Sequence, residues 1–283
     1  MTDLLHHRRA EATGPGWRER FVDGDRASAS KSVGRAVSES LSYVEIQDFA
    51  TAEERGGLLD SAAGVTSRNS AGGKSSHVMF ASGANGNCDR YSVETLLDDR
   101  AKATSAALLD RLLGFLDGGE GEGGGGGPQM VGGGPEMCAL AKEVFVGTGT
   151  EDRRNLRERE VVWYGEPDEA GMIHPEPKVN VYSEGGYFNQ HADGMELTLL
   201  VVLTDRFEGG GTAFYKDLDL AHVDLPPEAA AAGMSNGDHN LPPEVVAKPQ
   251  AGTAMIWGAT LQHMALPVTK GTRSVYVGSF NLK

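Results

Sequence analysis

The sequence predicts a mostly β fold, a β-sandwich or jelly roll, with covering helices. From about residue 160 onward, short apolar or alternating runs are separated by Gly, Pro, Asp and Asn turns, as is typical of such folds. Two stretches before residue 120 carry helical patterns instead. The chain has 283 residues, 39% of them apolar, which suits one domain with a buried core. The expected strands are 161–164, 179–182, 197–203, 212–215, 254–257 and 274–280.

The N-terminal region is expected to begin without structure. Residues 1 to about 38 are polar and lack sustained periodicity, which predicts a disordered extension. The first ordered element is expected to be a strand over 42–46. Thr51 and Glu54 then fit a capping box, in which hydroxyl and carboxylate satisfy free amide donors at a helix start. This helix is expected to run to about Ala63.

A second helix is expected from about Ser92 to Leu116. Its leucines recur at helical spacing, although the polar pair Thr104 and Ser105 interrupts their face. The pattern predicts a helix that covers a sheet. The apolar face consists of Leu97, Ala101, Leu108, Leu112 and Leu116, widened by Leu96, Leu109 and Leu113.

Two further segments are expected to be loops. Residues 118–135 are dominated by glycine and lack the Lys-Ser/Thr pair of a phosphate-binding loop, so they predict a flexible loop. Residues 216–250 contain two Pro-Pro pairs and an alanine run, and they look like an insertion with a short helix at most. The predicted organisation is one domain over 39–283, in which residues 39–117 support a core at about 160–283.

Charge and cysteine content limit the partners and the compartment. The 26 Lys+Arg and 40 Asp+Glu residues give a net charge of −14, and an acidic surface repels nucleic acid. No apolar run reaches the length of a membrane span, and the N-terminus lacks the apolar core of a signal peptide. Cys88 and Cys138 cannot form a disulfide framework. We therefore expect no nucleic-acid or membrane partner and a cytoplasmic or nuclear location.

Three residues of the C-terminal half have the chemistry of a metal site. His191 and Asp193 form a His-x-Asp triplet, and His263 lies just beyond a predicted strand. Two imidazoles and one carboxylate can occupy one face of an octahedral Fe(II) and leave positions open for other ligands. Strands that are distant in sequence are neighbours in a jelly roll, so the three can meet. The other histidines lack such neighbours and are expected at the surface: His6, His7, His77, His174, His222 and His239.

Arg273 predicts a second ligand beside the metal. It opens the last predicted strand, ten residues after His263. A dicarboxylate that chelates iron through one end needs a fixed cation at its other end, and a guanidinium binds a carboxylate through two hydrogen bonds. A hairpin between the strand that reaches His263 and the last strand would direct Arg273 into the barrel.

Four motifs in a fixed order carry a family resemblance over roughly residues 178–283. They are YSEGGYFNQHAD (182–193), LTDRFEGGGTAF (203–214), KPQAGTAMIW (248–257) and HMALPVTKGTR (263–273). This region resembles the prolyl 4-hydroxylase-like branch of the 2-oxoglutarate/Fe(II)-dependent dioxygenase superfamily, whose fold is a double-stranded β-helix. The strand and capped helix at 42–63 resemble the usual opening of that family.

The resemblance implies an oxygenase with a defined set of cofactors. His191, Asp193 and His263 would bind Fe(II), with O2 as a cosubstrate. Arg273 would bind the far carboxylate of 2-oxoglutarate, and Tyr182 would assist that carboxylate by hydrogen bonding. Ascorbate is expected to restore the iron after uncoupled turnover. Trp257 is expected to belong to the core and not to the site.

The expected reaction is hydroxylation of a side chain in a peptide or protein, with proline ahead of lysine. Collagen-type prolyl 4-hydroxylases carry Lys at the position of Arg273 and Tyr at that of Phe188, so proline does not follow from the motifs alone. Residues 271–280 are as similar to lysyl hydroxylases and other Arg-bearing hydroxylases, which leaves lysine or a small molecule open. A nucleic-acid demethylase is disfavoured, because its RxNxTxR-like run is lacking. A catalytically inactive binding domain is a further alternative.

Overall fold

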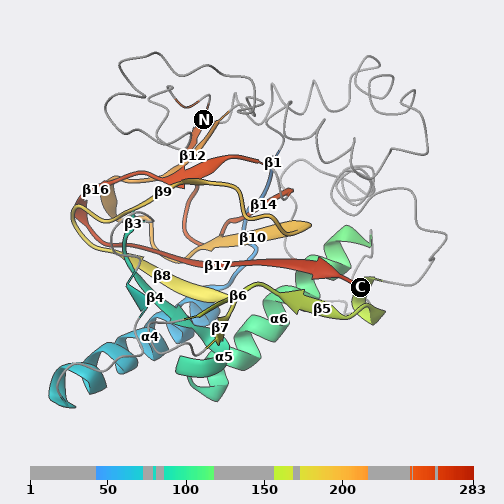
Figure 1. Cartoon of the computed structure of the whole chain (residues 1–283), viewed down its shortest axis with the longest axis horizontal. Helices are drawn as coiled ribbons and strands as arrows, with labels where there is room; N and C mark the ends of the chain where they lie inside the picture. The colour runs from blue at the N-terminus through green and yellow to red at the C-terminus, as the bar shows by residue number, and fades with distance from the viewer. Residues whose placement is uncertain are drawn as a thin grey trace.

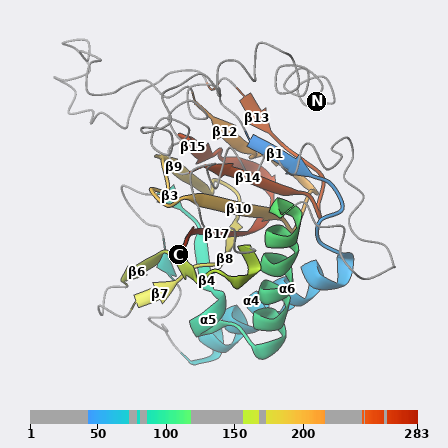
Figure 2. The same ribbon diagram turned by 90° about the vertical axis from the view of Figure 1, so that its right-hand side faces the viewer.

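The computed structural model describes residues 43–72, 79–80, 86–117, 156–167, 173–215, 243, 245–258 and 261–283. Within these ranges the chain forms two stacked β-sheets, with the helices packed against the outer face of one of them (Figures 1 and 2). The predicted N-terminal extension (1–38), the Gly-rich loop (118–135) and residues 216–242 of the predicted insertion lie outside the described residues.

The larger sheet has eight strands in the order β1-β14-β10-β17-β8-β4-β2, with β5 also paired to β17. Its pairings between β14, β10, β17 and β8 are all antiparallel. All the strands predicted after residue 160 are present, and all but 212–215 lie in this sheet. The strands are β1 (Tyr43–Ile46), β2 (Met79–Phe80), β4 (Asp89–Ser92), β5 (Val161–Trp163), β8 (Lys178–Tyr182), β10 (Leu197–Val202), β14 (Ala254–Gly258) and β17 (Arg273–Leu282).

The smaller sheet has five strands in the order β13-β12-β15-β9-β3. Two short ladders, β6 with β7 and β11 with β16, accompany the sheets. The strands are β3 (Gly86–Asn87), β9 (Tyr187–His191), β12 (Thr212–Phe214), β13 (Val245–Ala247), β15 (His263–Ala265), β6 (Gly165–Pro167), β7 (Ile173–Pro175), β11 (Phe207–Gly209) and β16 (Val268–Gly271). β13 forms one edge of this sheet, so the last residues of the predicted insertion 216–250 belong to the core and the predicted C-terminal bound was wrong.

The order in which the chain visits the two sheets defines a jelly roll. β8, β10, β14 and β17 are neighbours in the larger sheet, whereas β9, β12, β13 and β15 are neighbours in the smaller one. The chain passes from β8 to β9 and from β9 to β10, and so crosses between the sheets repeatedly. This winding of two facing antiparallel sheets is a double-stranded β-helix, and it confirms the predicted fold class.

The first helix begins as predicted and ends later. Helix α4 (Ala52–Gly72) opens with a reciprocal capping box: Glu54 N donates to Thr51 Oγ1 at 3.2 Å, and Thr51 N donates to Glu54 Oε2 at 2.8 Å. The predicted end at Ala63 was wrong, because Val65 is buried in the core beyond it. Packing of that side chain outweighs the low helix propensity of Gly64.

The predicted second helix is two helices. α5 (Val93–Leu96) and α6 (Asp99–Leu116) are separated by Leu97, whose backbone is extended, and by Asp98. The Asp98 carboxylate accepts from Ala101 N at 2.9 Å and caps α6. A short 3-10 helix, η1 (Leu156–Glu158), packs beside α6.

Apolar side chains form one core on each face of the larger sheet. Outside it, the leucine face of α6 packs with residues such as Val179 and Ile256, and Ser105 in that face hydrogen-bonds to the Tyr276 hydroxyl at 2.8 Å. Between the sheets lies a second cluster that includes Phe214 and Trp257. Alternation along each strand therefore sends every second side chain into the barrel.

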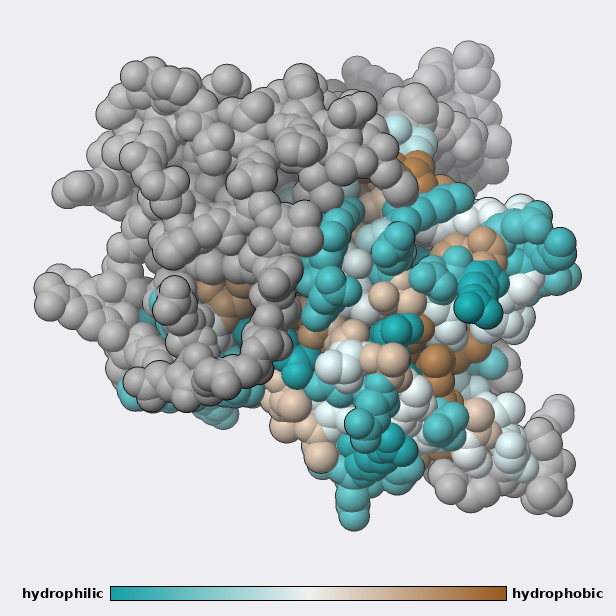
Figure 3. Space-filling view, turned by 180° about the vertical axis from the view of Figure 1, so that it is seen from behind, coloured by the Kyte–Doolittle hydropathy of each residue, from teal (hydrophilic) through white to brown (hydrophobic). Residues whose placement is uncertain are grey.

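The described surface offers little apolar area. Among the described residues, Tyr164 is the one exposed large apolar side chain, at 39%. On the face shown in Figure 3, apolar residues form small patches among hydrophilic ones. No helix within the described ranges is long and apolar enough to cross a membrane.

The capping box leads to a stability prediction. Thr51→Ala removes the hydroxyl that accepts from Glu54 N, and we expect it to lower the free energy of unfolding by about 1 kcal/mol in urea titrations. Glu53→Gln is the matched control, because Glu53 reaches Arg100 only in an exposed ion pair at 3.6 Å. Equal stabilities of the two variants would contradict a stabilising cap.

Candidate metal centre

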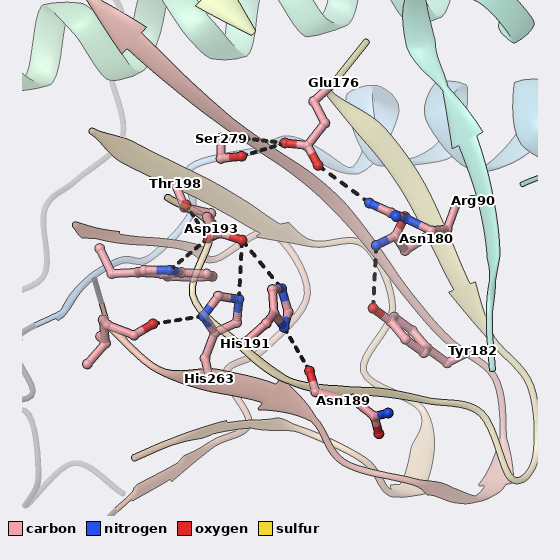
Figure 4. Close-up of polar contacts among 12 residues, drawn as sticks. Arg90, Glu176, Asn180, Tyr182, Asn189, His191, Asp193, Thr198, His263 and Ser279 are labelled. Carbon is pink, nitrogen blue, oxygen red and sulfur yellow. Dashed lines mark hydrogen bonds and ion pairs between the residues drawn. The ribbon is translucent and has the colours of Figure 1, made fainter. Parts of the chain in front are cut away.

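The three metal-capable residues meet inside the barrel (Figure 4). His191 ends β9, His263 begins β15, and the two are direct partners in the β9–β15 ladder. Asp193 follows β9 by two residues. One ligand atom from each residue lies within 4.8 Å of the others. The structure therefore brings together all three residues that the sequence analysis selected.

Backbone carbonyls orient both imidazoles. His191 Nδ1 lies 2.7 Å from Asn189 O, and His263 Nδ1 lies 3.0 Å from Leu261 O. A carbonyl only accepts hydrogen bonds, so Nδ1 carries the proton in both rings and the lone pair is on Nε2. Each Nε2 faces the Asp193 carboxylate, which is the arrangement that metal-binding histidines need.

The spacing of the ligand atoms suits one metal ion. Asp193 Oδ1 lies 3.4 Å from His191 Nε2 and 3.7 Å from His263 Nε2. Two ligand atoms about 2.1 Å from one ion and at right angles to each other lie roughly 3 Å apart. Two neutral imidazoles and one carboxylate are a donor set for Fe(II) that leaves other coordination positions open.

The second oxygen of Asp193 is held by the protein. Oδ2 accepts a short hydrogen bond from Thr198 Oγ1, and Trp257 Nε1 donates to it at 3.3 Å. Trp257 is buried in the core, as predicted, and its indole N–H also contacts the site. Thr198 was not predicted as a site residue, although it is the one polar residue in the apolar run of β10 and faces inward there.

Burial and mutual charge set the ionisation of this group. Burial lowers the pKa of His263 to about 4, against the opposite influence of Asp193. Burial alone would raise the pKa of Asp193, but the nearby His263 and His191 and the Thr198 hydroxyl outweigh it, so the pKa lies below its usual range. At neutral pH His263 is neutral and Asp193 is ionised, which are the forms that bind metal.

Arg273 lies in the barrel as a buried cation. It opens β17 as predicted and is 3% exposed. Its Nη2 donates to Thr212 Oγ1 at 2.8 Å, and its guanidinium carbon lies 5.2 Å from the centre of the Tyr182 ring. Within the described part of the chain, no carboxylate pairs with it. Burial lowers the pKa of Arg273, but a guanidinium stays charged in proteins.

The predicted route of Arg273 into the barrel was wrong. The predicted strand before His263 is β14, and although β14 and β17 share the larger sheet, β10 lies between them, so no hairpin joins them. Arg273 enters instead as the direct partner of Tyr182 in the β8–β17 ladder of the larger sheet. Its side chain then reaches Thr212 in the smaller sheet and spans the barrel.

The register of the smaller sheet relates Arg273 to the metal-capable group. Thr212 precedes Phe214 by two residues on β12, and Phe214 is the direct partner of His263. Residues two apart on a strand face the same side and lie about 7 Å apart. Thr212, which accepts from Arg273, therefore faces the barrel two residues along β12 from Phe214, the direct partner of the candidate metal ligand His263.

Tyr182 lines the same part of the barrel. It is buried, and its hydroxyl accepts from Asn180 Nδ2 at 3.4 Å. Burial raises its pKa well above the usual value, so the hydroxyl is protonated and can donate a hydrogen bond. Burial likewise raises the pKa of the neighbouring Cys88 thiol, to about 12.

A buried ion pair beside Tyr182, on the inner face of the larger sheet, was not predicted from the sequence. Arg90 Nη2 lies 3.4 Å from Glu176 Oε1, while Glu176 Oε2 accepts from the Ser279 hydroxyl at 2.8 Å. The Arg90 guanidinium lies 5.1 Å from the Phe188 ring centre, and Phe188 packs on His191 at 4.7 Å. Burial raises the pKa of Glu176 against the attraction of Arg90. No motif in the sequence pairs these residues, because only strand register joins them.

One of the histidines expected at the surface is buried. His174 is 0% exposed, and its Nδ1 lies 2.8 Å from Thr95 Oγ1. The prediction failed because His174 belongs to β7, which packs against α5. The other five, His6, His7, His77, His222 and His239, lie outside the described residues.

Comparisons with known proteins find similarity only among solved structures. No protein-family model and no curated protein matches the chain. Among solved structures, a prolyl-4-hydroxylase from Pseudomonas putida matches at 15% identity over 87% of this chain and 97% of that one, with a TM-score of 0.43.

Two other solved structures illustrate the spread of these matches. The non-heme α-ketoglutarate-dependent carbocyclase SnoK from nogalamycin biosynthesis matches at 14% identity over 91% of this chain and 85% of that one, with a TM-score of 0.46. A prolyl hydroxylase from Trichoplax adhaerens, solved with a hypoxia inducible factor peptide fragment, matches at 11% identity over 95% and 94%, with a TM-score of 0.41.

The low pKa of His263 predicts how acid affects the metal-free protein. Between pH 6.5 and about 4 the unfolded chain binds a proton that folded His263 does not, so the free energy of unfolding should fall as the pH falls through this window. Urea titrations with chelator present would measure this slope. In His263→Gln the slope over the window should be smaller, and an unchanged slope would contradict a neutral buried imidazole.

Proposed function

We propose that the protein is an Fe(II)- and 2-oxoglutarate-dependent dioxygenase that hydroxylates a side chain of a peptide or protein, with proline ahead of lysine. The observation that carries the proposal is the position of Arg273, a buried cation without a carboxylate partner in the described chain, beside a His-Asp-His group. The motif resemblance of residues 178–283 supports the same conclusion.

The uncompensated charge of Arg273 favours a dicarboxylate ligand. Removing a charge from water costs several kcal/mol, as a rough scale, unless a partner in the protein offsets that cost. Among the described residues, the contacts of Arg273 are with the neutral Thr212 hydroxyl and the face of Tyr182, beside the protonated Cys88 thiol. An anionic ligand would supply the missing partner, and a dicarboxylate could extend from Arg273 towards the metal-capable group.

Each residue then has a stated role. His191, Asp193 and His263 would hold Fe(II); Arg273 would bind the far carboxylate of 2-oxoglutarate, and Tyr182 would donate a second hydrogen bond to it. The bound iron supplies the redox chemistry by which O2 converts 2-oxoglutarate to succinate and CO2 and hydroxylates the substrate. The protein's own contribution is to orient these ligands in a barrel whose inner side chains exclude water. We also propose ascorbate as the reductant that restores the iron.

We also propose a peptide or protein substrate and a cytoplasmic or nuclear location. The net charge of −14 supports a peptide or protein substrate over nucleic acid. Cys88 is a free buried thiol, which is compatible with the cytoplasmic or nuclear location that we propose. We further propose that the chain is one dioxygenase domain over 39–283 behind an N-terminal extension.

Turnover of the cosubstrate tests the activity. Succinate formation from 2-oxoglutarate should require Fe(II), should be stimulated by proline-containing peptides more than by lysine-containing peptides or methylated nucleic acid, and should be lost in His191→Ala. Ascorbate should extend the time course. Turnover that persists in His191→Ala would disprove the metal site, and stimulation by lysine peptides or small molecules alone would overturn the substrate assignment.

Arg273 should serve binding at the expense of stability. In Arg273→Met we expect 2-oxoglutarate affinity to fall roughly 30-fold or more, because the buried carboxylate loses its partner. The free energy of unfolding should stay equal or rise, since an uncompensated buried charge is removed. Isothermal titration with 2-oxoglutarate and urea unfolding would measure the two effects.

The matched control for that variant is Lys270→Met. Lys270 lies on β16, the strand before β17 in the chain, and forms an exposed ion pair with Glu208 at 2.9 Å. Its loss should change neither the affinity for 2-oxoglutarate nor the free energy of unfolding appreciably. Arg273→Met that binds 2-oxoglutarate like the wild type would refute the assigned role.

A further inference from the structure

Two donors from neighbouring strands converge on one oxygen of Asp193. The Thr198 hydroxyl and the Trp257 indole N–H both donate to Oδ2, whereas Oδ1 faces the two imidazoles (Figure 4). A carboxylate oxygen offers about two acceptor positions. The protein therefore occupies both positions on Oδ2 and leaves Oδ1 for another ligand.

The register of the larger sheet builds this pair of donors. Thr198 on β10 and Trp257 on β14 are direct partners in the antiparallel ladder, and both side chains point into the barrel. β14 is held on both sides, by β1 and β10, and Thr198 is 0% exposed. A one-residue slip of either strand would turn its donor to the opposite face, so the geometry is fixed by the backbone.

Trp257 also contacts a second member of the metal-capable group. Its ring lies 4.8 Å from the His263 ring, edge to face, and 5.4 Å from Phe214. One side chain thus fixes a carboxylate by hydrogen bonding and an imidazole by packing. Removing the indole N–H while keeping an aromatic ring separates these two effects.

We propose that Thr198 and Trp257 are positioning residues that restrict Asp193 to binding metal through Oδ1 alone. With Oδ2 occupied, Asp193 takes one coordination position instead of two, and one more position stays open for the cosubstrates. This inference rests on the proposed function, since it assumes that the three residues hold a metal. It extends that function to two residues that touch neither metal nor cosubstrate.

The competing explanation is purely structural. Thr198 and Trp257 could satisfy a buried carboxylate without any effect on the metal, because buried polar groups need partners in any protein. Their loss would then lower stability and leave metal binding unchanged. The two explanations differ in metal affinity and in the coordination of the bound ion, so both must be measured on the same variants.

Co(II), added alone to the anaerobic metal-free protein, is a suitable probe, because its visible spectrum reports coordination geometry. In Thr198→Val and Trp257→Phe we expect about 10- to 100-fold weaker Co(II) binding, the usual effect of losing a partner of a metal ligand. The ligand-field spectrum should also change as Oδ2 becomes free to coordinate. Thr198→Ser keeps the hydroxyl and should restore both affinity and spectrum.

Ser105→Ala is the matched structural control. It removes another buried hydroxyl, the one bonded to Tyr276 outside the barrel, and should lower stability without changing Co(II) affinity or spectrum. Folding of every variant is checked by circular dichroism. The two test variants alter different strands, so if one of them does not fold, the other still tests the proposal.

The outcomes separate the two levels of the argument. If the wild type binds Co(II) and both test variants bind it with the same affinity and spectrum, the positioning role is wrong and the metal site stands. If the wild type does not bind Co(II), the metal site and with it the proposed function fail, and the positioning role falls with them.

Discussion

The antiparallel pairing of β9 with β15 is the constraint on which the candidate site depends. It makes His191 and His263 direct neighbours although they are far apart in sequence, and Asp193 follows two residues after the end of β9. Both rings owe their orientation to carbonyls two residues earlier on their own chain segments, so the strand backbone fixes position and tautomer together. A shift of one residue in this ladder would send one imidazole to the outer face of the sheet and abolish the group.

The rest of the polar interior is joined to this pair through the larger sheet. Thr198 is the partner of Trp257 on one side and of Ser279 on the other. Thr198 and Trp257 donate hydrogen bonds to Asp193. Ser279 donates to Glu176, which forms an ion pair with Arg90. Arg90 in turn lies over the ring of Phe188, which packs on His191. Buried charges in such a network are costly unless each is partnered. Arg273 is the exception among the described residues, and an interior that partners its other charges makes a ligand the simplest partner for it.

Much of the fold could be predicted from the sequence, and the reasons for the failures are physical. The apolar run at 197–202 and the capping box at Thr51 and Glu54 are local signals strong enough to predict the elements that form there. β9 and β15 were not predicted as strands, because their polar side chains serve the site and break the apolar pattern. Helix α6 starts separately from α5 because Asp98 caps it, and the continuous leucine pattern gives no sign of this break.

The metal-capable triplet and Arg273 were identifiable by residue chemistry. The contacts of Trp257, Thr198, Arg90 and Glu176 depend instead on the register between strands, which cannot be read from a single sequence. His174 was misplaced because it lies on β7, which packs against α5, and the sequence does not reveal this packing.

The central claim is that one barrel interior holds a metal at the His-Asp-His group and a dicarboxylate between that metal and Arg273. Its most direct test is a crystal structure of the protein with Fe(II) and 2-oxoglutarate, prepared without oxygen, with anomalous scattering recorded at the iron edge. The account predicts one iron peak at coordination distance from His191 Nε2, Asp193 Oδ1 and His263 Nε2, with the far carboxylate of 2-oxoglutarate on the Arg273 guanidinium. An iron peak elsewhere, or a cosubstrate that leaves Arg273 without an anionic partner, would contradict it.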